Sequence, residues 1–383
     1  MISDENLDTI STGIEDLIRK SLPDLTKDRK DIAWLWDRTL FLTTHGSHAY
    51  GTSTPTSDHD YKGFAIPPMP YMTGYAKRFE QAEFRGDPDM VVYNIQKFFK
   101  LAADCNPSII EVLFTSDEDH LIVHPLAEPI LAKRDLFLSK KAKFTFSGYA
   151  VSQLKKIKSH YKWIKNPPTA PPTREEFGLP ERTVIPSDQL QAAQSMIRKQ
   201  IEHWNVPIDE LDDAARIAVQ ERFVEALAII KVGQENLEPI AGKLLGFSDN
   251  FLELLDKERQ YKGKMEEWRS YQNWLATRNA KRSELEKKWG YDTKHGMHLV
   301  RLMRMGGEIL RGEGVKVKRP DADELMAIRN GLWTYEELLE WAEKHEKALN
   351  DLYLTSKLPH TPSTLELDKL LCETVELSRF HLK

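Results

Sequence analysis

Short apolar runs separated by turn-forming residues characterise the first part of the chain. Residues 38–44 (RTLFLTT) are predicted to form a buried strand, and residues 58–66 (DHDYKGFAI) a second strand that ends before two prolines. Residues 89–93 (DMVVY) are a third candidate strand. Helical spacing predicts helices over residues 8–20 and 95–103, and a further one that opens at Asn106-Pro107. The first of these predictions is weakened by Gly13.

Helical periodicity dominates from about Phe144 onward. One helix is predicted over residues 148–166, followed by a proline-rich loop at about residues 166–187. Ser187 is a candidate cap for the next helix, and long helical segments are expected at 209–236 and 265–289. Two capping boxes are also expected, one formed by Asp321 with Glu324 and the other by Thr334 with Glu337.

These patterns predict an α+β protein with two domains. Residues 1–143 would form a domain built on a small mixed sheet with helices. Residues 144–383 would form a large, mostly helical domain that carries the proline-rich loop.

Composition narrows the class of protein. The chain has 383 residues, 40% of them hydrophobic and 30% charged, and a net charge of −5. No run of uncharged apolar residues reaches the roughly 20 needed to cross a bilayer. The acidic N-terminus lacks a signal pattern, and two cysteines are too few for a disulfide framework. We therefore expect a protein of the reducing cytoplasm with no membrane partner.

The most informative stretch is HGSHAYGTSTPTSDHDYKG, residues 45–63. Residues two apart in a strand project from one face, so the carboxylates of Asp58 and Asp60 would point together. A hard divalent cation such as Mg²⁺ relieves the repulsion between two such charges. Backbone N–H groups in the turn at Gly46-Ser47 could hold phosphate oxygens beside them. Two aspartates at this spacing, taken alone, are also common at exposed strand ends.

The complete motif is more specific than the aspartate pair. Gly-Ser-x-Ala-Tyr-Gly-Thr followed by Pro-x-Ser-Asp-x-Asp-x-x-Gly resembles the signature of nucleotidyltransferases with a DNA polymerase β type palm. It is most similar to the predicted RNA repair pathway DNA polymerase β family. The resemblance extends over about residues 39–114 and, less closely, over 294–339, while the middle of the chain is not covered.

The resemblance implies a palm domain with a third carboxylate on a neighbouring strand. Asp89 matches by position and would share a face with Val91 and Tyr93. Asp87 is a rival two residues away. Glu111 is a second rival, although on a predicted helix it is more simply a surface or capping carboxylate.

The resemblance also implies catalysis with two Mg²⁺ ions, with Mn²⁺ as a possible substitute. Asp58 and Asp60 would bind the ion that carries the triphosphate. Together with Asp89 they would hold a second ion that activates the attacking hydroxyl, and Asp89 would be the candidate general base. Gly46 and Ser47 would bind the terminal phosphates.

A helix predicted to begin near Thr293 and to run to Arg311 offers further candidates. Lys294, His298 and Arg301 could present cations to the nucleotide, with Arg301 and Arg304 on the polar side. His295 falls in the apolar stripe, which favours a structural role. The His-x-x-His spacing of His295 and His298 suggests a metal pair, but no third soft ligand lies nearby in sequence, so we reject zinc there.

The helix over residues 148–166 is strongly basic. Such a run is usually a solvated face, but it could also track a nucleic-acid backbone, with Tyr161 or Trp163 available for stacking on a base. The candidate nucleic-acid ligands are Lys155, Lys156, Lys158, Lys162 and Lys165.

The sequence thus predicts a Mg²⁺-dependent nucleotidyltransferase that moves a nucleoside monophosphate from an NTP, ATP or another, to a hydroxyl acceptor. The favoured acceptor is an RNA end, as in RNA repair or modification. One alternative is nucleotidylation of a small molecule or of a protein side chain. Another is a catalytically silent nucleic-acid-binding or regulatory protein, against which the intact Gly-Ser turn and both aspartates argue.

Overall fold

The computed structural model describes residues 22, 24–86, 88–204, 237–278 and 280–382. The chain falls into two compact units, one comprising Met1–Ile164 with Asn279–Lys383 and the other Lys165–Arg278. Three sequence predictions lie outside the described residues: the helices over 8–20 and 209–236, and the position of Asp87. The first unit includes residues on both sides of the predicted domain boundary at 143/144, and that boundary stays a prediction.

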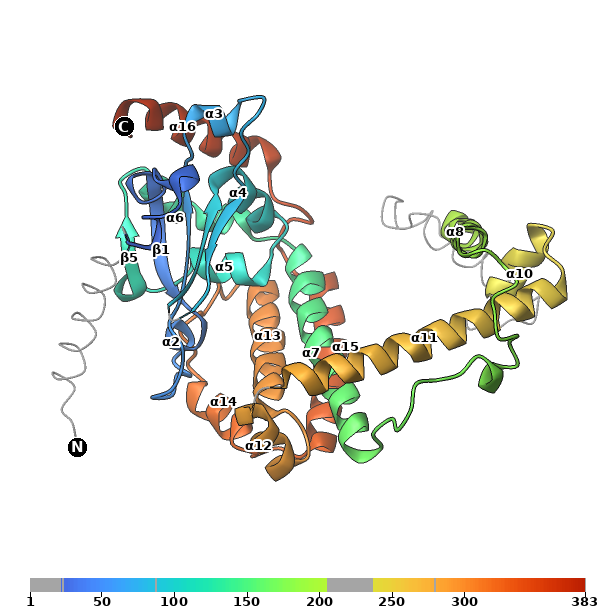
Figure 1. The fold of residues 1–383 in the computed structure, drawn as a ribbon. Helices are drawn as coiled ribbons and strands as arrows, with labels where there is room; N and C mark the ends of the chain where they lie inside the picture. Colours follow the sequence, from blue (N-terminus) through green and yellow to red (C-terminus); the bar gives the residue numbers. More distant parts are fainter. Residues whose placement is uncertain (1–21, 23, 87, 205–236, 279, 383) are drawn as a thin grey trace. The chain divides into compact units, whose positions relative to one another are not determined.

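A five-stranded mixed sheet lies in the first unit, with the strand order β3-β4-β2-β1-β5 (Figure 1). Strands β2 and β4 are parallel, and every other neighbouring pair is antiparallel. The sheet and the helices that follow it confirm the α+β class. The strand bounds are β1 Thr39–His45, β2 Asp60–Ala65, β3 Gln81–Phe84, β4 Asp89–Asn94 and β5 His120–Val123.

Alternation along the strands separates the two faces of the sheet. Leu42, Tyr61 and Val92 lie in an apolar cluster on one face, which the segment before β1 helps to cover. Phe41 and Phe64 project into the larger core on the opposite face. Helices α4 and α5 pack against β4 and β1 on that side and are seen beside the sheet in Figure 1.

The helices of the first unit share this larger core with the sheet. Helix α13 is buried along most of its length and packs against α14 and α15. Close approach of α7 is possible because Gly306 has no side chain, since a Cβ there would meet that of Phe146 at 3.1 Å. The helix bounds are α2 Gly46–Tyr50, α3 Met69–Met72, α4 Ile95–Ala103, α5 Pro107–Leu113, α6 Glu128–Ala132, α7 Lys141–Lys165, α12 Ala280–Trp289, α13 Thr293–Arg311, α14 Ala322–Arg329, α15 Tyr335–Thr355 and α16 Thr364–His381.

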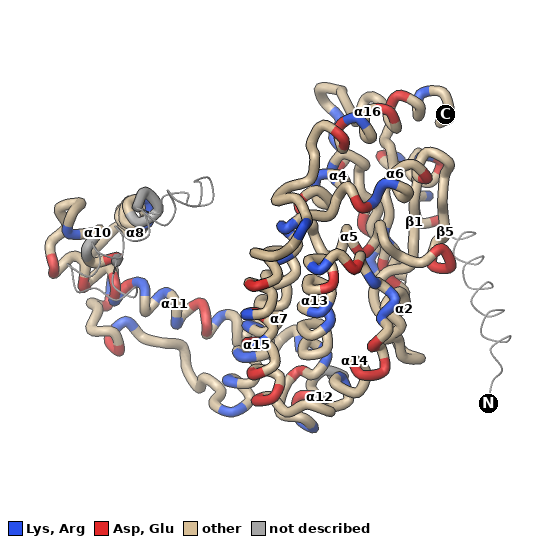
Figure 2. The backbone as a smooth tube through the Cα atoms, turned by 180° about the vertical axis from the view of Figure 1, so that it is seen from behind, with Lys and Arg blue, Asp and Glu red and all other residues tan. Residues whose placement is uncertain are grey.

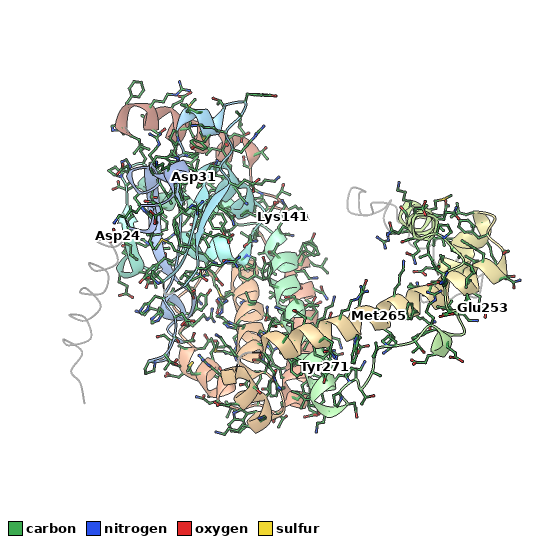
Figure 3. All side chains as sticks on the ribbon, viewed as in Figure 1. Asp24, Asp31, Lys141, Glu253, Met265 and Tyr271 are labelled. Atoms are coloured by element: carbon green, nitrogen blue, oxygen red, sulfur yellow. The ribbon has the colours of Figure 1, made fainter. Side chains whose placement is uncertain are left out.

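The second unit has a small core of its own, formed by α8 (Ser187–Trp204), α10 (Leu237–Leu244) and α11 (Asp249–Thr277). Met265 and Tyr271, labelled in Figure 3, lie on α11. The helical segment expected over residues 265–289 is divided, because α11 ends at Thr277 and α12 is a separate helix.

The proline-rich segment is held to α11 by a buried acid. Arg174 Nη1 donates to Glu258 Oε2 at 3.0 Å, and Thr183 Oγ1 donates to Glu258 Oε1 at 3.2 Å. Because Glu258 is only 2% exposed, these polar contacts stabilise the segment against the helix.

The two expected capping boxes have different outcomes. Thr334 and Glu337 form theirs, with the Thr334 N–H donating to Glu337 at 2.7 Å and the Glu337 N–H donating to Thr334 Oγ1 at 3.2 Å. Asp321 occupies the N-cap of α14 but makes no side-chain capping bond. The box predicted there is wrong, because Asp321 and Glu324 both accept from Arg304 instead, at 2.5 and 2.8 Å.

Among the described residues, no helix is both long and apolar enough to span a membrane. Figure 2 shows lysines and arginines interspersed with acidic residues over the helices of the first unit. Lys141, labelled in Figure 3, begins α7 and lies 2.7 Å from an Asp104 carboxylate oxygen.

Candidate active site

Asp60 and Asp89 stand side by side at the starts of two parallel strands. The register of β2 and β4 pairs these residues directly, and the Asp89 N–H donates to the His59 carbonyl at 2.9 Å. Paired positions on neighbouring strands project to the same face, so both carboxylates point to the side covered by α5. This is the face that alternation predicted for Asp89.

Asp58 lies two residues before Asp60 but outside the strand, because β2 begins at Asp60. The strand start predicted at residue 58 is therefore wrong by two residues, and alternation does not fix the direction of Asp58. Asp58 and Asp89 are exposed, whereas Asp60 is partly buried. Burial raises the pKa of Asp60, and the negative charges of Asp89 and Asp58 raise it further. The three carboxylates thus gather at one solvent-accessible edge of the sheet.

Gly46 makes room for the Asp60 carboxylate. It has a φ of +69°, and a Cβ built on it would lie 2.2 Å from Asp60 Oδ2. Any side chain at this position would therefore displace the carboxylate as well as strain the backbone. The short helix α2 starts at this glycine and ends at Gly51, whose φ is +73°. The close contact between Gly46 and Asp60 explains physically why the Gly-Ser turn and the aspartates occur together.

Lys62 belongs to the site, although the sequence analysis missed it. It projects to the same face as Asp60, and its Nζ donates to Ser108 Oγ on α5. Burial lowers the pKa of Lys62, while Glu111, Asp60 and Asp89 favour its charged form. The alternation that placed Asp60 could have identified Lys62 two residues later. Its ammonium partly balances the carboxylate charges at this edge.

Glu111 is buried, and its expected position on the surface is wrong. It is 2% exposed and accepts hydrogen bonds from Arg301 Nη1 and, at 2.6 Å, from the Tyr50 hydroxyl. His45 Nε2 lies 3.3 Å from the same carboxylate, and the Arg301 guanidinium stacks 3.7 Å from the centre of the Tyr50 ring. These contacts connect β1, α2, α5 and α13 through one carboxylate.

Contacts within this network and burial together shift the pKa values of Glu111 and His45. Burial alone would raise the pKa of Glu111, but Arg301, His45 and Tyr50 hold it well below its usual range. Burial lowers the pKa of His45, so this ring is neutral at pH 7. Glu111 and Arg301 therefore form a buried ion pair to which Tyr50 adds a hydrogen bond.

The four residues singled out on α13 have different environments. Lys294 is partly buried and its charge acts on Asp60. His298 is also partly buried, and burial together with Arg301 and Lys294 lowers its pKa well below the usual value. Arg301 is 5% exposed, so the position on the polar side predicted for it is wrong. His295 is 7% exposed, in keeping with the structural role that the apolar stripe favours.

The basic face of α7 is solvent-accessible, but its aromatic residues are engaged in packing. Tyr161 stacks on Tyr335 with ring centroids 3.9 Å apart, and Trp163 is 7% exposed. The expected availability of these rings for base stacking is therefore wrong. All five candidate lysines are exposed: Lys155, Lys156, Lys158, Lys162 and Lys165.

Comparison with known proteins supports the resemblance predicted from the sequence. Residues 15–166 match the model of the RNA repair pathway DNA polymerase beta family, a range that includes Asp58, Asp60 and Asp89. The resemblance expected over residues 294–339 lies outside this match and stays a prediction. The match suggests a polymerase-beta-like nucleotidyltransferase, a class of enzyme that usually uses divalent metals.

One relative comes from Enterobacteria phage T4, the "Uncharacterized 38.9 kDa protein in nrdC-mobD intergenic region". It is 33% identical over 90 residues, which cover 21% of this chain and 27% of the phage protein. The match thus spans only about a quarter of that relative's length. No solved structure matches the chain.

The Glu111–Arg301 pair yields a stability prediction. We expect Glu111→Gln to lower the free energy of unfolding by about 3–5 kcal/mol, because the substitution leaves the Arg301 charge buried and unbalanced. Urea denaturation at pH 7 measures this loss. Glu118→Gln is the matched control, since Glu118 pairs with Lys318 at the surface and its loss should cost at most about 1 kcal/mol.

The depressed pKa of Glu111 also predicts how the free energy of unfolding changes with pH. A carboxyl whose pKa falls on folding stabilises the native state above its ordinary pKa of 4.5, and this contribution declines as the pH falls below that value. The wild-type protein should therefore lose stability below about pH 4.5 more steeply than Glu111→Gln. Equal slopes for the two proteins would show that the pair contributes nothing.

Gly46→Ala should separate backbone strain from crowding of Asp60. Gly51→Ala is its control, because both glycines have left-handed backbones and a Cβ at Gly51 meets nothing closer than Ala322 at 3.7 Å. Both variants should lose about 1–2 kcal/mol of stability. Only Gly46→Ala should also lose Mg²⁺ binding, measured by titration calorimetry. Intact Mg²⁺ affinity in Gly46→Ala would contradict the packing of Asp60 against this glycine.

Proposed function

We propose that the protein is a Mg²⁺-dependent nucleotidyltransferase that transfers a nucleoside monophosphate from an NTP to a hydroxyl acceptor at an RNA end. The observation that carries the proposal is the direct pairing of Asp60 with Asp89 across two parallel strands, with Asp58 close by. The match of residues 15–166 to an RNA repair pathway polymerase beta family supports the same reaction class.

The donor set fits a hard divalent cation. Asp58, Asp60 and Asp89 supply carboxylate oxygens, which Mg²⁺ prefers as ligands, and the last two are held side by side by the strand register. Burial raises the pKa of Asp60, and the charges of Asp89 and Asp58 raise it further despite Lys62 and Lys294, so a bound cation would favour its ionised form. When bound, two Mg²⁺ ions, or Mn²⁺ in their place, would neutralise charge on the attacking and leaving oxygens of a phosphoryl displacement.

Asp89 is the proposed general base. The acceptor hydroxyl oxygen forms a bond to the α-phosphorus while the bond to the pyrophosphate oxygen breaks, and the hydroxyl proton passes to Asp89. This role suits Asp89 because it is exposed at the strand end and projects to the same face as Asp60. Asp87, the rival in sequence, lies outside the described residues.

The leaving phosphates would be held by groups on two elements beside the carboxylates. Gly46 and Ser47 begin α2 and would offer backbone N–H groups to phosphate oxygens. Lys294, in the first turn of α13, would supply a cation, since its charge already acts on Asp60. His298 is neutral at pH 7 because its pKa is lowered, so it would donate a hydrogen bond rather than a charge.

Arg301 is better suited to positioning than to direct contact with the nucleotide. Its guanidinium is buried against Glu111 and Tyr50, and those contacts fix α13 relative to α2. The direct contact with phosphate predicted from the sequence stays a prediction, and the burial of Arg301 argues for an indirect role.

RNA is the favoured acceptor because α7 exposes five lysines along one helix, and the matched family is described as an RNA repair family. The net charge of −5 instead favours a small molecule or a protein side chain. A catalytically silent RNA-binding or regulatory protein would have no use for the gathered carboxylates. Labelled NTPs incubated with the protein and total RNA, small metabolites or the protein itself would show which pool becomes labelled.

Changes to the carboxylates should separate binding from chemistry. Asp58→Asn and Asp60→Asn should abolish transfer and Mg²⁺–NTP binding. Asp89→Ala should retain NTP binding, measured by calorimetry, but lose roughly 10²–10⁴-fold in kcat, because the hydroxyl loses its base. Asp87→Ala is the control and should stay active. Near wild-type turnover in Asp60→Asn would exclude the proposed site.

Asp60→Asn should also make the metal-free protein more stable. The pKa of Asp60 is raised on folding, so its ionised form destabilises the native state once the pH exceeds that raised value. At pH 7 without Mg²⁺ the melting temperature of Asp60→Asn should therefore exceed that of the wild type.

The lysines of α7 should make RNA binding depend on salt. Phosphate contacts release counterions, so Lys155→Gln with Lys158→Gln should reduce the slope of log affinity against log salt by roughly 0.7 per lysine. Lys347→Gln with Lys369→Gln is the control, since these lysines are exposed on α15 and α16. An unchanged slope in the first pair would make the basic face of α7 an ordinary solvated surface.

A further inference from the structure

Three potential metal ligands converge away from the carboxylate edge of the sheet. His160 of α7, Glu286 of α12 and Asp292 at the N-cap of α13 place one ligand atom each within 4.8 Å of the other two. Glu286 is 2% exposed and Asp292 is fully buried, whereas the His160 side chain is 15% exposed. His160 lies 126 positions before Glu286 in the sequence, so the fold brings it to the two carboxylates.

The distances in this cluster suit a small tetrahedral ion. Zn²⁺ bonds of about 2.0–2.1 Å to nitrogen and oxygen place neighbouring ligand atoms roughly 3.3 Å apart. His160 Nδ1 lies 3.3 Å from Glu286 Oε1. His295 lies beside the cluster, because its Nε2 is 3.7 Å from Asp292 Oδ2 and its ring centre is 6.2 Å from that of His160.

The chemistry of the ligands distinguishes this cluster from the carboxylate edge. Imidazole and carboxylate together favour Zn²⁺ and related transition metals, whereas an all-oxygen set favours Mg²⁺. The ligands are also buried, as in closed structural sites, rather than open to a substrate.

The local charges also favour a cation. Two buried carboxylates this close repel each other, and ionised groups inside a protein need compensating positive charge. Arg329 acts electrostatically on Asp292, and His160 Nδ1 lies 3.3 Å from Glu286 Oε1. The competing interpretation is therefore a metal-free ion-pair cluster, and the two make different predictions about added metal.

We propose that His160, Glu286 and Asp292 form a structural site for a divalent transition metal of the Zn²⁺ type, which joins α7, α12 and the start of α13. Zinc was not expected at His295 and His298, because no third soft ligand lies near them in sequence. The proposed site uses neither of those two histidines, since its imidazole comes from His160 on α7.

A metal here would stabilise the start of α13. Asp292 Oδ1 accepts from the His295 N–H at 3.1 Å and thereby caps the helix, while its Oδ2 lies 3.7 Å from His295 Nε2. Coordination of one oxygen and capping by the other would fix the first turn of α13. Lys294 lies in that turn, so the site would also hold this lysine in place beside Asp60.

The test measures metal content and stability on the full-length protein. Asp60→Asn serves as the background throughout, so that the carboxylate edge is disabled and added metal reports on the second site. After dialysis against Zn²⁺ and then metal-free buffer, atomic emission should find about one zinc per chain. Chelation should lower the melting temperature, and Zn²⁺ should restore it while Mg²⁺ does not.

Substitutions identify the ligands. His160→Ala and Glu286→Gln should each lose bound zinc and the response of the melting temperature to Zn²⁺. His360→Ala and Glu284→Gln are matched controls, because both side chains are exposed and Glu284 lies on the same helix as Glu286. Co²⁺ in place of Zn²⁺ should give the intense visible absorption of a tetrahedral site in the background protein but not in His160→Ala.

Two results would overturn the proposal. If chelation leaves the melting temperature unchanged and no zinc is retained, the cluster is a metal-free ion-pair network. If zinc is retained equally by Glu286→Gln and Glu284→Gln, the ion is bound elsewhere. Neither result tests nucleotidyl transfer, because metal content and melting temperature are both measured without nucleotide or acceptor.

Discussion

The buried pair of Glu111 and Arg301 is the constraint on which the rest of the candidate site depends. These residues are 190 positions apart in sequence, yet their side chains bond directly and are almost completely buried. Tyr50 donates to the same carboxylate, and His45 lies against it. Because an unpaired charge at this depth would be costly, any arrangement of the sheet, α2 and α13 that separates the pair is disfavoured. We propose that the pair acts by holding these elements in position rather than by contact with substrate.

The carboxylates at the starts of β2 and β4 differ from the Glu111–Arg301 pair, because their negative charges are not matched by neighbouring cations. These carboxylates are held together by the register of β2 and β4 and not by a matched set of cations. Lys62 and Lys294 reduce the repulsion, but the pKa of Asp60 remains raised. Active sites commonly keep such uncompensated charge, and the stability it costs must come from elsewhere in the fold. Here Lys62 interacts electrostatically both with Glu111 and with Asp60 and Asp89.

Local pattern predicted β1, β2 and β4 but not β3 and β5, the short strands at the two edges of the sheet. Alternation correctly placed Asp89 on the face that Asp60 shares. Periodicity also identified α13 and the capping box at Thr334. It could not show that Glu111 and Arg301 are buried, because each looks like an ordinary charged residue on a helix and only its remote partner makes burial possible. The cluster of His160, Glu286 and Asp292 could not be predicted from the sequence for the same reason. Lys62 was accessible to sequence reasoning, since it continues the alternation from Asp60.

Helix α13 shows how these constraints combine. Arg301 anchors its middle to Glu111, and Asp292 with His295 anchors its first turn beside Glu286 and His160. Lys294 lies within the first anchored turn, and His298 lies between that turn and Arg301. A side chain that must meet a phosphate within a few tenths of an ångström is best carried by a helix fixed at more than one point, because rotation and sliding of that helix are then both prevented. The residues that hold α13 therefore matter to the proposed chemistry even though none of them needs to touch the nucleotide.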